Sequence, residues 1–230
     1  MTPSAFAAFS SVAFHRVFEL QQVWMDRPND HLPLQQRALE RFAEALRRAK
    51  KLPEGVNPQG LCFIGAAGAG KTHLLGEIRR EAADQGANFV LSDLTDVREF
   101  WPLLAMHYLQ SLRKLMNGVS QLQRILETLF SKTGRTAEVA SALNGSRALP
   151  RQELVAFANE LISSLRPIYG RDIVTRLRVF RALLYLESDD IDLSERAYSF
   201  LQGIEQIDEE SKQIYLSGPN SAKRVATELA

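Results

Sequence analysis

The sequence has little cysteine, almost no net charge and no long apolar run, and each shortage excludes a class of protein. Its single cysteine, Cys62, rules out an intramolecular disulfide framework and indicates a reducing compartment, which predicts a cytoplasmic protein. No apolar run approaches the roughly 20 residues that a membrane-spanning helix needs, so no membrane partner is expected. The uncharged first 14 residues lack the basic start of a signal peptide, and their apolar spacing favours an amphipathic helix.

Charge is balanced over the whole chain but not along it. Lys and Arg number 28 against 27 Asp and Glu, and the net charge of +1 gives no global field that would attract nucleic acid. Residues 151–186 nevertheless carry six basic and three acidic side chains, whereas residues 187–230 carry four basic and ten acidic ones. The two stretches could pair with each other, but two separately solvated faces are the favoured interpretation.

Helical pattern dominates what the sequence does contain. Hydrophobic residues make up 45% and charged residues 24% of the 230 residues, enough for a packed core and one or two domains. Only two apolar runs, 61–64 and 87–91, have the length and flanking turns of buried strands, and a third run at 213–216 is weaker. The remaining apolar residues recur at helical spacing and predict helices over 34–51, 72–85, 96–116, 122–129, 154–165, 173–184, 192–202 and 221–230.

The order strand, helix, strand predicts an α/β fold with an incomplete parallel sheet and a large helical insertion or lid. Because two strands alone would leave a sheet edge exposed, a protein partner or self-association is expected to complete the sheet. The small, polar residues 131–150 predict a loop. Four segments follow from this pattern: an N-terminal helical segment (1–52), a core (53–95), a helical insertion (96–206) and an acidic tail leading into a truncated core (207–230).

One segment carries recognisable chemistry. GAAGAGKT, residues 65–72, matches the pattern G-x-x-x-x-G-K-[ST] at every fixed position, between a predicted strand and a predicted helix. Its small residues let consecutive backbone N–H groups curl around a phosphate, and the helix that follows presents its positive end to the same anion. The lysine supplies charge to the β- and γ-phosphates, and the threonine hydroxyl is placed to ligate Mg²⁺. The predicted nucleotide-binding residues are Gly65, Ala66, Ala67, Gly68, Ala69, Gly70, Lys71, Thr72 and His73, with Thr72 as metal ligand and ATP with Mg²⁺ as cofactors.

This motif is the Walker A loop, and the chain resembles a P-loop NTPase. GAAGAGKTHLL (65–75) is similar to the loop of AAA+ and STAND-type ATPases. Residues 23–46 look like the segment ahead of the P-loop in large bacterial ATPases of that class, including phage-defence systems such as BREX, where this segment packs near the adenine. Residues 89–112 look like the strand and helix that follow the loop. The resemblance implies a P-loop NTPase fold and an ATP-driven switch or motor.

Hydrolysis in such enzymes needs a second strand that ends in a carboxylate for Mg²⁺, usually beside an acid that activates water. No run of four apolar residues followed by Asp-Glu occurs in the sequence. Weak catalytic candidates are Asp93, at the end of a predicted strand, and Glu187 and Asp189, after the apolar run at 183–186. A turn role is favoured for Asp93, and a helix end followed by an acidic loop for the other two. The chain is therefore expected to be an N-terminal portion of a longer ATPase.

Three further groups of side chains have competing interpretations. His73 is more readily a packing or polar contact than a catalytic group, and Cys62 a small apolar filler of a buried strand. Val23 and Trp24 fit either an adenine pocket, if the resemblance holds, or ordinary core packing. The spacing of the other histidines and the cysteine supports no zinc site. Those histidines are His15, His31 and His107.

Four arginines lie close together in the predicted helix over 173–184 and just before it: Arg171, Arg176, Arg178 and Arg181. They could contact DNA or reach a neighbouring nucleotide, but a solvated helix face is the favoured interpretation, and nucleic acid is an unsupported partner. Three functions besides an ATPase module stay open: a nucleotide-binding regulatory protein without turnover, a small-molecule or nucleoside kinase, and a helical adaptor with a vestigial P-loop.

Overall fold

The structure is a computed structural model, and it describes residues 23–25, 35–53, 56, 58, 60–66, 68–93, 100–131, 133–134, 149–169 and 174–229. The chain divides into two compact units, Met1–Phe89 and Val90–Ala230. The first unit contains the predicted phosphate loop. The second contains most of the helices and the two short strands. Each unit is described by itself below.

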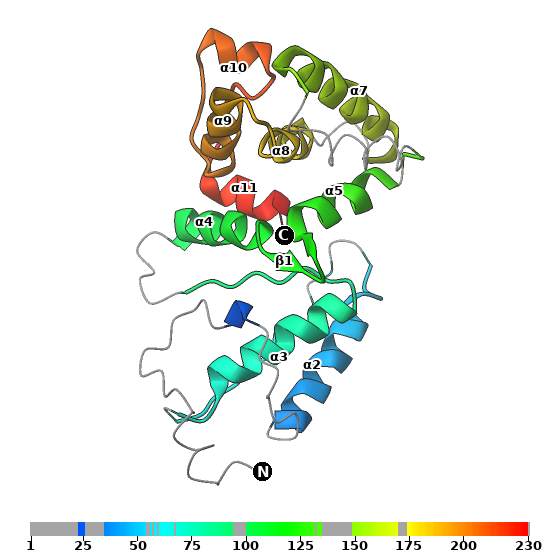
Figure 1. Ribbon diagram of the computed structural model, residues 1–230, viewed down its shortest axis with the longest axis vertical. Helices are drawn as coiled ribbons and strands as arrows, with labels where there is room; N and C mark the ends of the chain where they lie inside the picture. The colour runs from blue at the N-terminus through cyan, green and yellow to red at the C-terminus, as the bar shows by residue number, and fades with distance from the viewer. Residues whose placement is uncertain are drawn as a thin grey trace, which may run out of the picture. The chain divides into compact units, whose positions relative to one another are not determined.

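The N-terminal unit is built on two helices that lie side by side, α2 (Gln36–Ala49) and α3 (Lys71–Asp84) (Figure 1). Both helices confirm the predictions for 34–51 and 72–85. The α3 helix buries Leu74 and Ile78, as its apolar spacing requires. It ends before Gly86, whose φ of +69° is the left-handed conformation that a helix C-terminus favours in glycine.

The structure contradicts the predicted α/β class and its parallel sheet. The described residues 61–66 and 87–93 contain no strand, and the single sheet among the described residues is a two-stranded antiparallel one. Leu61 and Ile64, predicted to be buried, are 44% and 93% exposed. A short apolar run becomes a strand only if a neighbouring segment completes its hydrogen-bond ladder, and no described segment pairs with either run. Cys62 is accordingly an exposed free thiol and not a core filler.

The second unit is mostly helical. The described elements are α4 (Phe100–Leu112), β1 (Leu115–Met116), β2 (Val119–Ser120), α5 (Gln121–Ser131), α7 (Arg151–Tyr169), α8 (Val174–Tyr185), α9 (Ile191–Leu201), α10 (Glu209–Gln213) and α11 (Ala222–Leu229). Most of the predicted loop 131–150 and the first residues of the helix predicted over 96–116 lie outside the described residues.

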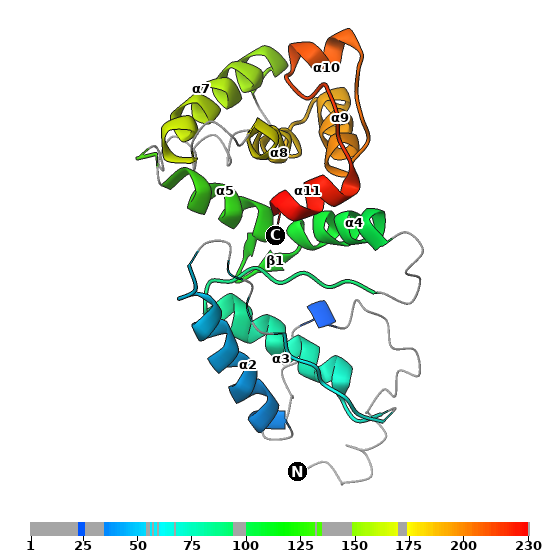
Figure 2. The ribbon, with the colours of Figure 1, turned by 180° about the vertical axis from the view of Figure 1, so that it is seen from behind.

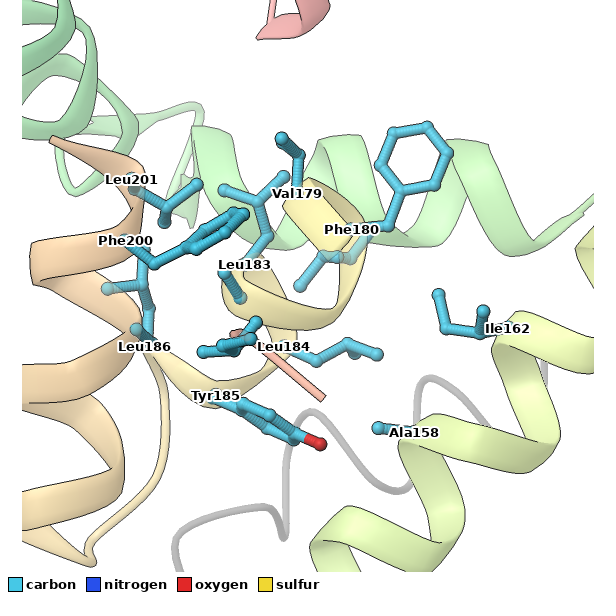
Figure 3. Close-up of a cluster of buried hydrophobic side chains, with 14 of the residues drawn as sticks. Ala158, Ile162, Val179, Phe180, Leu183, Leu184, Tyr185, Leu186, Phe200 and Leu201 are labelled. Carbon is cyan, nitrogen blue, oxygen red and sulfur yellow. The ribbon is translucent and has the colours of Figure 1, made fainter. Parts of the chain in front are cut away.

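The α8 helix lies at the centre of this unit, between α7 and α9 (Figures 1 and 2). Every residue from Val179 to Leu186 is buried, so α8 is covered on nearly all sides. Figure 3 shows its apolar side chains meeting Phe200 and Leu201 of α9 on one side and Ile162 of α7 on the other. The interlocking of these helices forms the main hydrophobic core.

The two strands form a tight hairpin, and its first strand lies within the range predicted as a helix, 96–116. Leu115 pairs with Ser120 and Met116 with Val119, in antiparallel register. The two turn residues, Asn117 and Gly118, have φ angles of +55° and +80°. Asn-Gly is the dipeptide that most favours such a turn, because both positions require positive φ. Met116 is buried beneath the hairpin.

Three other predictions about local structure were wrong. The α7 helix continues through Pro167, which lies in its last turn, instead of ending before it. The cap of α9 is Asp190, whose carboxylate accepts a hydrogen bond from the Leu193 N–H at 3.0 Å, and not Asp192. The weak strand at 213–216 is absent from these described residues, since α10 ends there and Tyr215 has a left-handed φ of +61°.

The α11 helix, predicted over 221–230, packs against α4 (Figures 1 and 2). The Tyr108 hydroxyl of α4 donates a hydrogen bond to the Leu229 carbonyl of α11 at 2.6 Å. Burial raises the pKa of Tyr108 to about 12, so the phenol keeps its proton and its role as donor across the neutral range. Arg176 of α8 reaches the same helix through an ion pair with Glu228 at 2.8 Å.

Basic and acidic side chains pair across α7, α9 and α10, where the sequence favoured separate solvated faces. Arg151 contacts Asp192 at 2.8 Å and Glu210 at 2.7 Å. Arg196 contacts Asp192, Asp208 and Glu210 at 3.1, 2.9 and 2.7 Å. Desolvation alone would raise the pKa of Asp192, but the hydrogen bonds and positive charges of Arg151 and Arg196 together outweigh it and hold this pKa below its usual range. The network ties the three helices together at their surface.

Replacement of a central core residue is expected to destabilise the second unit strongly. Leu183 is 1% exposed, and Leu183→Ala should lower the free energy of unfolding by about 3 kcal/mol through lost burial and a residual cavity. Urea-induced unfolding followed by circular dichroism measures this loss. The control is Ile207→Ala at a side chain that is 75% exposed, where a change within about 0.5 kcal/mol is expected. Equal losses in both variants would contradict the observed core.

The charge network predicts a pH-dependent contribution to stability. The pKa of Asp192 is lowered by folding, so its contribution is present above the unfolded pKa of about 4 and is lost as the pH falls through the lower folded value. Arg196→Gln should therefore cost about 1 kcal/mol at pH 7 and progressively less below about pH 4. Urea unfolding at several pH values tests this. Lys212→Gln, at an exposed pair with Glu209, should cost little at any pH.

Candidate phosphate-binding site

The glycine-rich loop makes a tight turn between the extended residues 60–66 and the start of α3. Gly68 and Gly70 have φ angles of +77° and +78°, which side chains with a Cβ rarely adopt. The turn is closed by a hydrogen bond from the Ala69 N–H to the Ala66 carbonyl at 3.2 Å. A Cβ placed on Gly65 would come within 3.2 Å of the Ala69 Cβ. The chain therefore needs glycine at these positions for the shape of the loop.

The loop leads straight into the N-terminus of α3. Gly70 is the N-cap residue, and no side chain among the described residues caps this end of the helix. No acidic residue lies in the first turn of α3. The first N–H groups of an uncapped helix lack internal acceptors and carry the positive end of the helix dipole. The start of α3 thus presents free donors and positive potential to an anion.

Lys71, the first residue of α3, curls back over the loop. Its ammonium group donates to the Gly65 carbonyl at 2.7 Å and to the Ala66 carbonyl at 2.8 Å. The side chain is exposed, so these two bonds compete with water and are weak in net terms. Lys71 therefore places a positive charge directly above the loop, in a position from which it can be drawn to a bound anion.

Gln35 supports the loop from the residue before α2, and sequence reasoning did not identify it. Its Nε2 donates to the Ala69 carbonyl at 2.9 Å. The same nitrogen lies 2.8 Å from the place where a Cβ on Gly70 would stand. The Gln35 Oε1 is buried without a hydrogen-bond partner. No local pattern reveals this contact, because 34 residues separate Gln35 from Ala69 and only the packing of α2 on α3 brings them together.

The positions of the other predicted site residues say less about their roles. Thr72 is half-buried in the first turn of α3, and its role as a Mg²⁺ ligand stays a prediction. The described residues contain no cluster of three His, Cys, Asp or Glu side chains that could hold a metal ion by themselves. Ala67 lies outside the described residues.

His73 lies beside Glu77, one turn further along α3, with 3.7 Å between Nε2 and the Glu77 Oε1. Glu77 is only 7% exposed and also forms an ion pair with Arg80. These three side chains follow one another at helical spacing on one face of α3, a signal that the sequence interpretation did not use. The arrangement agrees with a polar contact for His73, the favoured interpretation, because its nearest charged neighbour is already engaged.

Val23 and Trp24 belong to the core of the N-terminal unit. Val23 is 1% exposed, and its carbonyl lies 3.8 Å from the place where a Cβ on Gly76 of α3 would stand. The Trp24 ring meets the ring of Phe89 edge-on, with 5.4 Å between the ring centroids. Of the two interpretations left open by the sequence, core packing is the one that these contacts match.

The three weak catalytic candidates belong to the second compact unit. Asp93 lies at the end of the extended residues 87–93. Glu187 and Asp189 lie between α8 and α9, where a helix end followed by an acidic loop was favoured and is observed. None of the three is in the compact unit that contains Lys71. His107 hydrogen-bonds Ser92 at 2.9 Å, and His15 and His31 lie outside the described residues.

The solvated arginine face expected on α8 is not observed. Arg176 pairs with Glu228, Arg178 donates to the Ser217 carbonyl at 2.7 Å, and Arg181 is buried. Arg171 lies outside the described residues.

A separate open groove of about 530 Å³ lies between α2 and α3. It is lined by Ala43, Arg47, Lys50, Lys51, Glu81 and Gln85. None of these residues belongs to the loop at 65–72, so the groove is distinct from the candidate phosphate site.

Comparison with known proteins found no matching family model, no similar curated protein and no similar solved structure. Among the described residues, no helix is both long enough and apolar enough to cross a membrane. The functional argument therefore depends on the geometry of residues 65–72 and their neighbours.

The loop geometry predicts that alanine lowers the free energy of unfolding by different amounts at Gly68 and Gly70, the two glycines with positive φ. Nothing lies within 4 Å of a Cβ on Gly68, so Gly68→Ala should cost only the conformational strain of about 1–2 kcal/mol. Gly70→Ala carries the same strain plus the clash with Gln35, and should cost more in urea-induced unfolding. In a Gln35→Ala background the clash is removed, and the cost of Gly70→Ala should fall to that of Gly68→Ala. Equal costs in the wild-type background would show that Gln35 does not contact the loop.

Proposed function

We propose that residues 65–72 bind the phosphates of a nucleoside triphosphate, ATP in the first instance, together with Mg²⁺. The proposal depends on one observation. Gly68 and Gly70, both with positive φ, lead directly into the N-terminus of α3, which no described side chain caps, and the Lys71 ammonium lies over the turn. Backbone N–H groups, the helix dipole and a mobile cation are the features that recognise a phosphate chain. No acidic side chain of the first turn of α3 opposes them.

Each part of the loop has a distinct task in this proposal. The N–H groups around Gly68 and Gly70 and at the start of α3 donate to phosphate oxygens, as their lack of side-chain caps allows. Lys71 exchanges its two weak bonds to the Gly65 and Ala66 carbonyls for stronger, charge-assisted bonds to phosphate. The Thr72 hydroxyl ligates Mg²⁺, which neutralises phosphate charge when it is bound.

The resemblance to AAA+ and STAND-type ATPases supports the proposal that this loop belongs to a switch or motor driven by ATP, and the single cysteine supports a cytoplasmic location. Binding is the part of that function to which residues 65–72 contribute directly. A nucleotide-binding regulatory protein without turnover is the second candidate. It is favoured by the sequence, which contains no run of four apolar residues followed by Asp-Glu to ligate Mg²⁺ and activate water.

Calorimetric titration with MgATP tests the proposal. Lys71→Ala should weaken binding at least about tenfold, because charge-assisted bonds to phosphate are lost. Lys50→Ala is the matched control, since Lys50 also donates to a backbone carbonyl, that of Gln85, in the same unit but outside the loop. It should bind as the wild type does. Equal heats for the wild type and Lys71→Ala, or no binding by the wild type, would exclude a phosphate-binding role for the loop. Either result is what a helical adaptor with a vestigial loop would give.

Phosphate release measured on the same samples separates the two candidates. Binding that depends on Lys71, with no release above background, identifies a regulatory nucleotide-binding protein. Release that is abolished by Lys71→Ala identifies an ATPase, and Asp93, Glu187 and Asp189 then become the first carboxylates to replace by asparagine or glutamine.

A further inference from the structure

Arg181 is the one buried arginine among the described residues of the second unit. It projects from α8, the central helix, and is only 7% exposed. Its Nη2 donates to the Asn159 Oδ1 of α7 at 2.9 Å, and its guanidinium lies 5.0 Å from the centroid of the Tyr215 ring. Its Nε is buried and has no hydrogen-bond partner. A guanidinium keeps its charge at all ordinary pH values, so this position holds a buried positive charge.

The charge of Arg181 is not balanced by a carboxylate of the part of the chain that the structure describes. Burial lowers the pKa of Arg181, the nearby Tyr185 and Tyr215 raise it, and the positive charge of Arg166 lowers it further; no carboxylate takes part. The better exposed Arg151, Arg176 and Arg196 of the same unit all have acidic partners. A buried charge without a counter-ion is costly, and the positive charge of Arg166 adds to that cost. The site thus has an excess of positive charge that a ligand can balance.

Tyr215, which covers Arg181, is held in an unusual conformation. Its φ is +61°, a left-handed conformation that is uncommon for an aromatic residue. The residue nevertheless remains 52% exposed while its ring lies against the guanidinium. Hydrogen bonds from the Tyr215 N–H to the Lys212 carbonyl and from the Leu216 N–H to the Ser211 carbonyl keep the turn in place. These two bonds are those of a Schellman helix C-terminus, so the left-handed φ of Tyr215 belongs to the end of α10 and fixes the ring beside Arg181.

We infer that Arg181 and Arg166, with Asn159 and the ring of Tyr215, form a binding site for an oxyanion, the phosphate or carboxylate group of a ligand. The site lies where α7, α8 and the turn after α10 meet. In Figure 3 the hydroxyl of Tyr185 points toward α7, the helix that carries Asn159 and Arg166. Guanidinium groups donate charge-assisted hydrogen bonds to planar or tetrahedral oxyanions, and the anion supplies the missing counter-charge.

This site is independent of the nucleotide proposed above. All its residues belong to the second unit, and none belongs to the loop at 65–72. Arg166 is exposed in the last turn of α7, where it can reach a ligand without disturbing the core. Among the described residues the Nε–H of Arg181 has no hydrogen-bond acceptor, so its signal reports on an arriving oxyanion.

The test is a titration of the whole chain, followed by NMR at the arginine Nε–Hε signals. Sodium phosphate and sodium acetate are added in separate experiments at constant ionic strength, with sodium chloride as the third arm. We expect a saturable shift of the Arg181 signal with phosphate or with acetate and none with chloride. The anion that binds with the higher affinity shows whether the natural ligand presents a phosphate or a carboxylate group. No saturable shift with either anion, or the same shift with chloride, overturns the inference.

Two variants keep the inference testable without removing the buried Arg181. Arg166→Gln removes the second, exposed cation and should weaken oxyanion binding about tenfold, since one set of charge-assisted hydrogen bonds is lost. Arg113→Gln is the matched control, because Arg113 is an exposed arginine of the same unit that also stacks on a tyrosine, Tyr198, at 5.7 Å. It should bind as the wild type does. Equal affinities for Arg166→Gln and the wild type overturn the site.

Lys71→Ala separates this site from the phosphate loop. Because the Arg181 signal is read directly, its shift should be unchanged in Lys71→Ala even if phosphate also binds at residues 65–72. Loss of the shift in Lys71→Ala would show that the signal reports binding at the loop, and it would overturn the separate site.

Discussion

The second unit is organised by the burial of one helix, α8. Because every residue from Val179 to Leu186 is buried, α8 must be covered by neighbours on nearly all sides, and α7, α9 and α11 provide that cover. Close packing against it fixes the positions of these helices, and charged residues of α7, α9 and α10 can then form a defined network around Arg151 and Arg196. The same constraint places Arg181 in the interior, which is why its environment differs from that of the other arginines.

The N-terminal unit depends on a different and more local constraint. Two glycines with positive φ allow the chain to turn directly into α3, and this turn leaves the helix N-terminus open to an anion. Its support from Gln35 requires α2 to pack on α3, so the loop is shaped by its own residues and held in place by a helix distant in sequence. The two units thus offer positive potential by different means: backbone N–H groups in one and guanidinium groups in the other.

Much of the candidate site was predictable, whereas the fold class was not. The motif at 65–72, the start of α3 and the glycine after it follow from dihedral preferences and spacing, which act over a few residues. The runs 61–64 and 87–91 have the composition of strands, but a strand exists only with a hydrogen-bonded neighbour. Among the described residues neither run has one, and Ile64 is 93% exposed as a result. The hairpin at Asn117 and Gly118 had a clear dipeptide signal that a continuing helical pattern concealed.

By itself, the sequence determined the positions of most helices, the glycine-rich loop and the lysine at its end, because helical periodicity and backbone sterics are local properties. The tertiary structure alone decided which residues are buried and with which partners. It placed Gln35 on the loop, Glu77 in an ion pair and Arg181 in a buried position without a carboxylate among the described residues. These outcomes depend on which helix faces meet, and residues separated by tens of positions in the chain carry no local signal of that meeting.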